Sequence, residues 1–371
     1  MREARPVWLP SRRQLLLLRA CLGERDAALD AWREWRRDAP PDLAALERGS
    51  RRLLPLVYSN LGKALAGDPD SQVLRDAYRR SWTANQLIRR DAQEAIGVLR
   101  DAGLEVLALK GMALIGSAYG GDIGARPMAD IDLAVRPTRA KEAVRALVGA
   151  GFRPALADPE RQLRTRHSTA FLGPREVEVD LHSGMLWLAG LEEEMWRGST
   201  EGEVAGAPAR ILAPPDQLLQ VCAHGAAWNP VHPVRWAADA FKTIERAGGG
   251  FDWARLIALT AECRLVLPLR RSLSCLASEL AAPVPAETLA ELAAIPVSRS
   301  ERLAHGAIAR PPSPRRSLAM IWWFWEGHRA RARLERRRPT PVGLLRDLQG
   351  FWGLERPSRV PDHAMRRLLR R

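Results

Sequence analysis

The chain has 371 residues, of which 46% are hydrophobic and 27% charged, a composition typical of a globular protein rather than a disordered or fibrous one. No segment approaches the roughly 20 uncharged apolar residues of a membrane span, and the apolar run at 15–18 is too short for a signal peptide. The four cysteines form no CxxC pair, which argues against a zinc site or a disulfide framework. We therefore expect a cytoplasmic protein without a transmembrane segment.

The net charge of +14 is concentrated at the C-terminus. Residues 310–371 contain 16 arginines and 5 acidic residues, which leaves only +3 for the rest of the chain. This Arg- and Pro-rich tail, 310–371, also holds the apolar stretch LAMIWWFWEGH (318–328). Three interpretations stay open: an arm that binds nucleic acid, an amphipathic helix on an anionic membrane surface, and a terminal helix that packs its Trp face on the body.

The predicted elements begin with helices. From residue 11 to about residue 100, apolar residues recur at three- and four-residue spacings, which predicts helices broken at Pro40-Pro41 and Gly67-Asp68-Pro69. A mixed pattern follows and predicts strand, helix, strand, helix, strand, strand. These elements are LEVLALKG (104–111), GMALIGSAYGG (111–121), ADIDLAV (129–135), RAKEAVRALVGAG (139–151), STAFLG (168–173) and EVEVDLH (176–182).

Helical spacing returns at residue 212 and continues to about residue 295. The order of elements predicts an α+β fold, in which a small mixed β-sheet with packed helices is flanked by N-terminal and C-terminal α-helical regions. We divide the chain into 1–95, an N-terminal helical region; 96–205, the core with the sheet; 206–309, a C-terminal helical region; and 310–371, the basic tail.

Three carboxylates stand out on the predicted strands. Because side chains alternate along a strand, Asp130 and Asp132 share one face, where at about 7 Å they repel by about 2 kcal/mol at an effective dielectric constant of about 20. Asp180 joins them if its strand lies nearby. A divalent cation converts this repulsion into binding, and carboxylate oxygens are ligands that Mg²⁺ or Mn²⁺ accepts. An exposed strand with a solvated acidic face is the alternative.

Lys110-Gly111 lies where the first predicted strand turns into a helix. The free N–H groups at a helix N-terminus attract phosphate, and glycine permits a close approach to the backbone. Lys110 and Arg126 carry positive charge suited to a triphosphate. A phosphate cradle beside a carboxylate-held metal is the equipment for phosphoryl or nucleotidyl transfer. An ordinary turn at Lys110-Gly111 is the alternative.

These motifs resemble a known family. LALKGMALIGSAYGGDIGARPMADIDLAV, followed by EVEVDLHSGML, is similar to the nucleotidyltransferase superfamily of the DNA polymerase β type. Within it, the bacterial family described as uncharacterised nucleotidyltransferases shows Lys-Gly, Tyr, Arg, Asp-Ile-Asp and a later Asp-Leu-His. Here these are Lys110-Gly111, Tyr119, Arg126, Asp130-Ile131-Asp132 and Asp180-Leu181-His182. The resemblance covers roughly residues 10–300.

The resemblance implies an enzyme that transfers a nucleoside monophosphate from an NTP to a hydroxyl or similar acceptor and releases pyrophosphate. Asp130, Asp132 and Asp180 would be the catalytic and metal-binding residues, and Lys110, Gly111 and Arg126 would bind the nucleotide. The cofactor would be Mg²⁺ or Mn²⁺, and the acceptor is not specified. The alternative is a non-catalytic module of the same fold that binds nucleic acid or a partner protein through its basic tail.

Several further polar residues have two interpretations. His182 is either a partner of Asp180 or a packed strand residue. His224, Trp228, Arg235, Trp236 and Asp239 follow the family's pattern and either grip the base or acceptor or serve packing, with a buried His–Asp contact.

Overall fold

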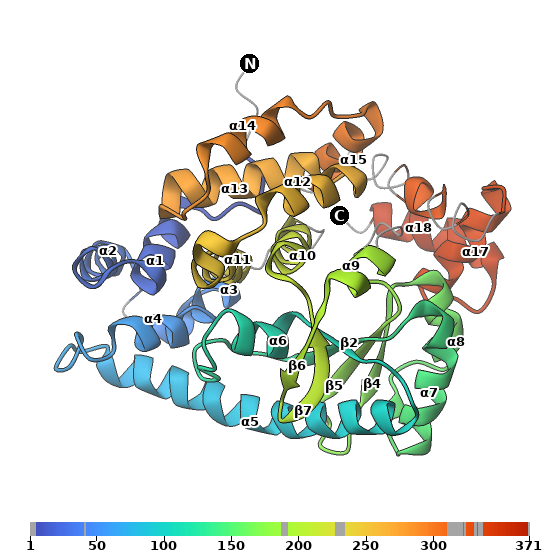
Figure 1. Cartoon of the computed structure of the whole chain (residues 1–371), viewed down its shortest axis with the longest axis horizontal. Helices are drawn as coiled ribbons and strands as arrows, with labels where there is room; N and C mark the ends of the chain where they lie inside the picture. The colour runs from blue at the N-terminus through green and yellow to red at the C-terminus, as the bar shows by residue number, and fades with distance from the viewer. Residues whose placement is uncertain are drawn as a thin grey trace.

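The computed structural model describes residues 5–40, 42–186, 192–226, 234–309, 322, 324–329, 332 and 337–369. Within these residues it confirms the α+β fold: a seven-stranded mixed sheet lies between helices on both faces (Figure 1). Trp228 and much of the basic tail lie outside the described residues.

The sheet places the predicted strands side by side. Its strands are β1 (Leu107–Leu109), β2 (Asp130–Ala134), β3 (Arg153–Pro154), β4 (Ser168–Leu172), β5 (Glu178–His182), β6 (Thr200–Val204) and β7 (Ala207–Ile211). They are arranged in the order β3-β4-β5-β2-β1-β7-β6. β2 runs parallel to β5 and antiparallel to β1, so the strand with the two aspartates is central.

One face of the sheet is buried under two helices, α5 (Ser71–Asp101) and α7 (Ala140–Gly149) (Figure 1). Ile131 and Leu133 of β2 point into this core, and each is 1% exposed. Burying side chains of this size contributes about 1.5 to 3 kcal/mol each. This anchoring fixes the register of β2, and therefore presents Asp130 and Asp132 on the opposite face.

The helices before and after the sheet pack together on that opposite face, and most of them contribute buried side chains to one core. The rings of Trp8 and Trp236 meet edge to face with centroids 5.7 Å apart, although they lie 228 residues apart in the chain. These helices are α1 (Arg12–Leu22), α2 (Arg25–Arg37), α3 (Arg48–Arg51), α4 (Leu54–Leu61), α10 (Pro214–Ala226), α11 (Arg235–Ala247), α12 (Trp253–Glu262), α13 (Val266–Leu280), α14 (Ala286–Ala294) and α15 (Arg299–Ala309).

Two strands extend the sheet beyond the sequence prediction. β6 and β7 form a hairpin that pairs with β1, although only Val204 of β6 is buried and the segment lacks apolar alternation. The predicted boundary at residue 205 falls inside this hairpin, and the predicted boundary at residue 95 falls inside α5, which continues without a break. The division into four regions stays a prediction.

The remaining helices are α6 (Lys110–Ser117), α8 (Pro159–Thr165), α9 (Glu192–Gly198), α17 (Pro341–Phe351) and α18 (Val360–Leu369). In the described part of the tail, α17 packs against α8, and the guanidinium of Arg166 lies 5.1 Å from the Phe351 ring centroid. His328 Nδ1 lies 2.7 Å from Asp347 Oδ2. Among the described helices, none is both long and apolar enough to cross a membrane.

Candidate active site

The register of β2 and β5 brings the predicted carboxylates together. Asp132 pairs with Asp180 across the two parallel strands, and paired residues in a sheet point to the same face. One ligand atom from each of Asp132, Asp180 and His182 lies within 4.8 Å of the others. Asp130 precedes Asp132 by two residues on β2 and lies on the same face, but it is outside this three-residue cluster.

Lys110 contacts this cluster directly. Its Nζ lies 2.6 Å from Asp132 Oδ1, and His182 Nε2 lies 3.0 Å from the same oxygen. Burial raises the pKa of Asp132, but Lys110 and His182 outweigh it and hold that pKa far below its usual range. For Asp180, burial and the charge of Asp132 raise the pKa, against the opposing effects of His182 and Lys110.

The backbone at Lys110 is strained. This residue begins α6 with a φ of +43°, in the left-handed region that non-glycine residues seldom adopt. Such a conformation costs about 1 to 2 kcal/mol and is retained where the surroundings impose it, often at functional sites. Here it lies at the junction of β1 and α6, where the Lys110 ammonium reaches Asp132.

Gly111 is closely packed. A Cβ atom at this position would lie 2.9 Å from Met128 Sδ and 3.3 Å from Arg126 Nη1. The glycine therefore lets the Arg126 guanidinium approach the first turn of α6. Arg126 and Gly111 both line the same pocket as Lys110.

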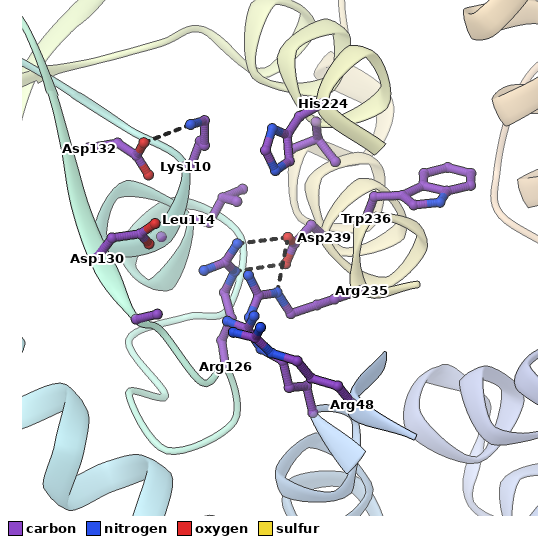
Figure 2. Close-up of a pocket in the computed structure, with 14 residues that line it drawn as sticks. Arg48, Lys110, Leu114, Arg126, Asp130, Asp132, His224, Arg235, Trp236 and Asp239 are labelled. Atoms are coloured by element: carbon purple, nitrogen blue, oxygen red, sulfur yellow. Dashed lines mark hydrogen bonds and ion pairs between the residues drawn. The ribbon is translucent and has the colours of Figure 1, made fainter. Parts of the chain in front are cut away.

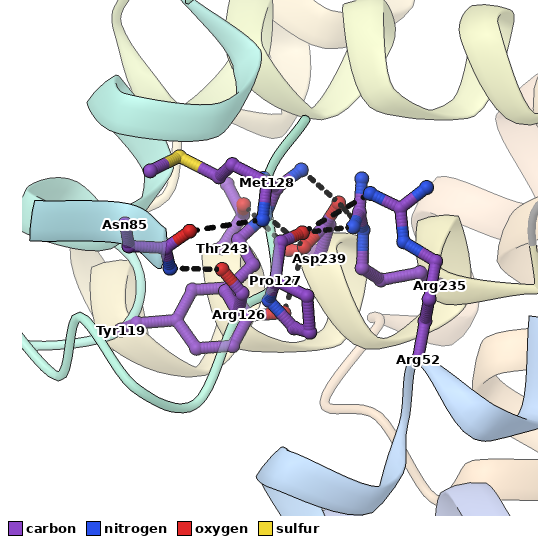
Figure 3. Close-up of polar contacts among 9 residues, drawn as sticks. All are labelled: Arg52, Asn85, Tyr119, Arg126, Pro127, Met128, Arg235, Asp239 and Thr243. Carbon is purple, nitrogen blue, oxygen red and sulfur yellow. Dashed lines mark hydrogen bonds and ion pairs between the residues drawn. The ribbon is translucent and has the colours of Figure 1, made fainter. Parts of the chain in front are cut away.

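Arg126 is held by a buried ion pair. Its Nε and Nη2 each donate a hydrogen bond of 2.8 Å to the Asp239 carboxylate of α11, which also accepts a 2.7 Å bond from the Tyr119 hydroxyl. Asn85 of α5 donates to the Arg126 carbonyl and accepts from the Met128 amide (Figure 3). Asp239 is thus bonded to Arg126 and Tyr119. The buried His–Asp contact, one of the interpretations of the sequence, is not the contact that holds this carboxylate.

These groups surround a pocket of about 260 Å³ between the sheet and the helical body (Figure 2). Asp130, Asp132 and Lys110 lie on one side, and His224, Trp236 and Asp239 on the other. Asp180 is not among its described lining residues. The described lining consists of Arg48, Arg52, Lys110, Gly111, Leu114, Arg126, Ala129, Asp130, Asp132, Val221, His224, Arg235, Trp236 and Asp239.

The comparison with protein families agrees with this geometry. The sequence profile of the family described as "Uncharacterised nucleotidyltransferase" matches residues 47–281, which is more than half of the chain. The chain belongs to this family, which confirms the family resemblance found in the sequence over residues 47–281. A search of curated proteins finds no match.

Three features of the site were not predicted from the sequence. Arg48 and Arg52 line the pocket from the N-terminal helices, and Asn85 fixes the loop that carries Arg126. Of the three, only Asn85 leaves a weak signal, as a polar residue at helical spacing from Ile88 and Ala92, and Ser81 and Asp91 leave the same signal on α5. His182, for which two roles stayed open, is buried and contacts Asp132.

Proposed function

We propose that this protein is a metal-dependent nucleotidyltransferase, which transfers a nucleoside monophosphate from an NTP to a hydroxyl or similar acceptor and releases pyrophosphate. The observation that carries the proposal is the pairing of Asp132 with Asp180 on the sheet face next to a pocket lined by Lys110 and Gly111. Membership of a nucleotidyltransferase family supports it.

The donor set fits a divalent cation. Asp132, Asp180 and His182 bring two carboxylates and an imidazole within 4.8 Å, and the carboxylates suit Mg²⁺ or Mn²⁺. We assign Asp130 to the same site because it shares the face of Asp132 and lines the pocket. When bound, the cation supplies charge stabilisation to the attacking and leaving oxygens.

The reaction forms one bond and breaks one. The acceptor oxygen bonds to the α-phosphorus, the bond from that phosphorus to the bridging oxygen breaks, and pyrophosphate leaves. In this proposal Asp180 accepts the proton of the attacking hydroxyl. Lys110, Gly111 and Arg126 bind the nucleotide phosphates, with Arg126 Nη1 close to Gly111 on the pocket wall.

A transfer assay tests the proposal. Purified protein is incubated with labelled NTPs, Mg²⁺ or Mn²⁺ and cell extract, and label transfer and pyrophosphate are measured after a thermal-shift panel has selected the NTP. We expect Asp130→Asn/Asp132→Asn to abolish transfer and Glu203→Gln, an exposed carboxylate on β6, to retain it. Transfer by the double variant at the wild-type rate would refute the assignment.

The basic tail supports a second candidate, a non-catalytic module that binds nucleic acid or another partner. The +11 charge of residues 310–371 is the observation that favours it. Replacing the exposed Arg356, Arg359 and Arg366 by glutamine should then weaken RNA or DNA binding and its salt dependence. Unchanged binding would remove this candidate. The cytoplasmic location stays a prediction.

A further inference from the structure

A second group of cations lies on the pocket wall across from the aspartates. Arg48 and Arg52 come from α3 and the residue that follows it, and Arg235 is the first residue of α11. All three line the pocket that holds Asp130 and Asp132. Figure 2 shows Arg48 and Arg235 among them. None of the three belongs to the residues assigned to catalysis or nucleotide binding above.

Arg52 and Arg235 converge on one neutral oxygen. Arg52 Nη2 donates a 3.2 Å hydrogen bond to the Pro127 carbonyl, and Arg235 Nη1 donates to the same carbonyl (Figure 3). A carbonyl oxygen orients the two guanidiniums but does not neutralise them. Their charges therefore face the pocket from two segments that lie far apart in the sequence.

The nearest carboxylate does not balance these charges. Asp239 already accepts two bonds from Arg126 and one from Tyr119. Arg235 Nε lies 3.8 Å from Asp239 Oδ2, beyond hydrogen-bond distance, and this buried nitrogen has no hydrogen-bond partner in the described structure. Asp239 is thus a single negative charge beside two guanidiniums.

The described pocket lining has an excess of positive charge. It contains five basic side chains, including Lys110, and three aspartates. Burial and the charge of Arg126 lower the pKa of Arg235 to about 9, and they also lower the pKa of Arg52. Both directions indicate that bringing an anion into this wall is favourable.

We propose that Arg48, Arg52 and Arg235 form a phosphate subsite, which holds the terminal phosphates of the NTP and then the departing pyrophosphate. This inference rests on the proposed function, because the metal site on Asp130 and Asp132 places the α-phosphate at the opposite wall. Guanidiniums donate paired N–H groups that match phosphate oxygens. A phosphate group on the acceptor has the same chemistry, and competition distinguishes the two sources.

The test is a calorimetric titration of the full chain with pyrophosphate, ATP and AMP. We expect Arg52→Gln and Arg48→Gln to weaken pyrophosphate and ATP binding about 10-fold to 100-fold, the usual cost of losing a charged hydrogen bond, and to leave AMP binding unchanged. The affinity of Arg52→Lys for pyrophosphate should lie between those of the wild type and Arg52→Gln, since lysine keeps the charge but lacks the paired N–H donors of the guanidinium. The melting temperature of each variant verifies folding.

Matched controls are available on the same helices. Arg51 of α3 and Arg246 of α11 are exposed and do not line the pocket, so Arg51→Gln and Arg246→Gln should bind pyrophosphate as the wild type does. Arg235→Gln is a second test at the buried member of the subsite. Wild-type affinity in folded Arg48 and Arg52 variants, or no pyrophosphate binding by the wild type, would overturn the proposal.

Competition and turnover separate the remaining outcomes. Displacement of ATP by pyrophosphate supports the NTP assignment, whereas simultaneous binding of both overturns it in favour of an acceptor phosphate. If the arginine variants lose pyrophosphate binding but the wild-type protein shows no transfer, the phosphate subsite is retained and the transferase function is rejected. If the protein shows transfer but its arginine variants bind pyrophosphate as the wild type does, the transferase is retained and the phosphate subsite is rejected.

Discussion

Two of the ion pairs at the pocket, Arg126–Asp239 and Lys110–Asp132, differ in how firmly they are held. Arg126 and Asp239 meet through two hydrogen bonds of 2.8 Å, and their side chains are 4% and 7% exposed. Lys110 meets Asp132 through a single contact, and its side chain is 21% exposed. Arg126–Asp239 is nearly inaccessible to solvent, and we call it the closed pair. Lys110–Asp132 is accessible from the pocket, and we call it the open pair.

Their surroundings differ in the same direction. Asp239 belongs to α11 and Arg126 to the loop before β2, so this pair joins the helical body to the sheet. Asp132 instead lies next to Asp180 and His182, where other ligand atoms converge. We infer that Arg126 Nε and Nη2 form a structural connection with Asp239 and leave Nη1 next to Gly111 on the pocket wall, while Lys110–Asp132 is an exchangeable contact in which a lysine balances a carboxylate.

The largest expected effect comes from breaking the structural pair. Asp239→Asn should lower the free energy of unfolding by about 3 to 5 kcal/mol, because it leaves Arg126 and Arg235 buried without a counter-charge. Urea unfolding at neutral pH measures this. Glu245→Gln, an exposed change on the same helix, is the control and should cost far less. A stable Asp239→Asn variant would remove the distinction between the pairs.

Breaking the open pair should affect the reaction more than the fold. Lys110→Met should lower the transfer rate about 100-fold, within the range for losing one charged donor at a reacting phosphate. It should cost less unfolding free energy than Asp239→Asn, since Asp132 keeps its contact with His182. Initial rates and urea unfolding on the same preparation test both statements. Wild-type turnover, or an equal loss of stability, would contradict them.

The residues Lys110 and Asp132 could be singled out from the sequence, but neither their contact nor the Arg126–Asp239 pair was predicted. Lys110, Asp132 and Asp180 lie on or beside short strands, where apolar alternation fixes the face of the two aspartates, and the resemblance found in the sequence rests on these same residues. The pairing of Arg126 with Asp239 depends instead on how α11 docks against a loop 113 residues earlier. No local pattern encodes that docking.

For a different reason, two members of the phosphate subsite, Arg48 and Arg52, were not predicted, whereas Arg235 was singled out only because it follows the family pattern. Lysine and arginine together number 57 in this chain and only four are lysines, so an arginine carries little information by itself. The meeting of Arg52 with Arg235 at one carbonyl depends on how the helices before and after the sheet pack into one body. The β6–β7 hairpin was missed because the exposed, charged residues of β6 lack apolar alternation, while β7 alternates only through small residues, Ala207 and Ala209.

The pH dependence of stability sharpens the comparison further. Burial raises the pKa of Asp239, but Arg126 and its hydrogen bonds outweigh it and leave that pKa below its ordinary value. A carboxyl with a depressed folded-state pKa stabilises the fold above its unfolded pKa of about 3.9, and this contribution is lost as the pH falls towards the folded value.

The stability gap between wild type and Asp239→Asn should therefore be constant from about pH 5 to 7 and narrow below about pH 4, by at most about 1.4 kcal/mol per pH unit. Urea unfolding at stepped pH values measures the gap. A gap that widens on acidification would show that Asp239 is not held as a carboxylate by Arg126.

The smallest effect is expected at Gly111, which lies between the two pairs. A Cβ there would meet Met128 Sδ at 2.9 Å and Arg126 Nη1 at 3.3 Å, so Gly111→Ala should cost about 1 to 3 kcal/mol of unfolding free energy. At Gly116 on the same helix, no described atom lies within 4 Å of the position that a Cβ would occupy, and Gly116→Ala should stabilise by about 0.4 to 1 kcal/mol.

Comparing Gly111→Ala with Gly116→Ala tests whether the position of Arg126 affects the part of the site that contains Lys110 and Asp132. If the added methyl displaces Arg126, transfer should fall in Gly111→Ala and not in Gly116→Ala, because only the first position faces the pocket. If only the flexible Met128 side chain moves, stability falls and the transfer rate is kept. Equal behaviour of the two alanine variants in both measurements would mean that the space around Gly111 constrains neither ion pair.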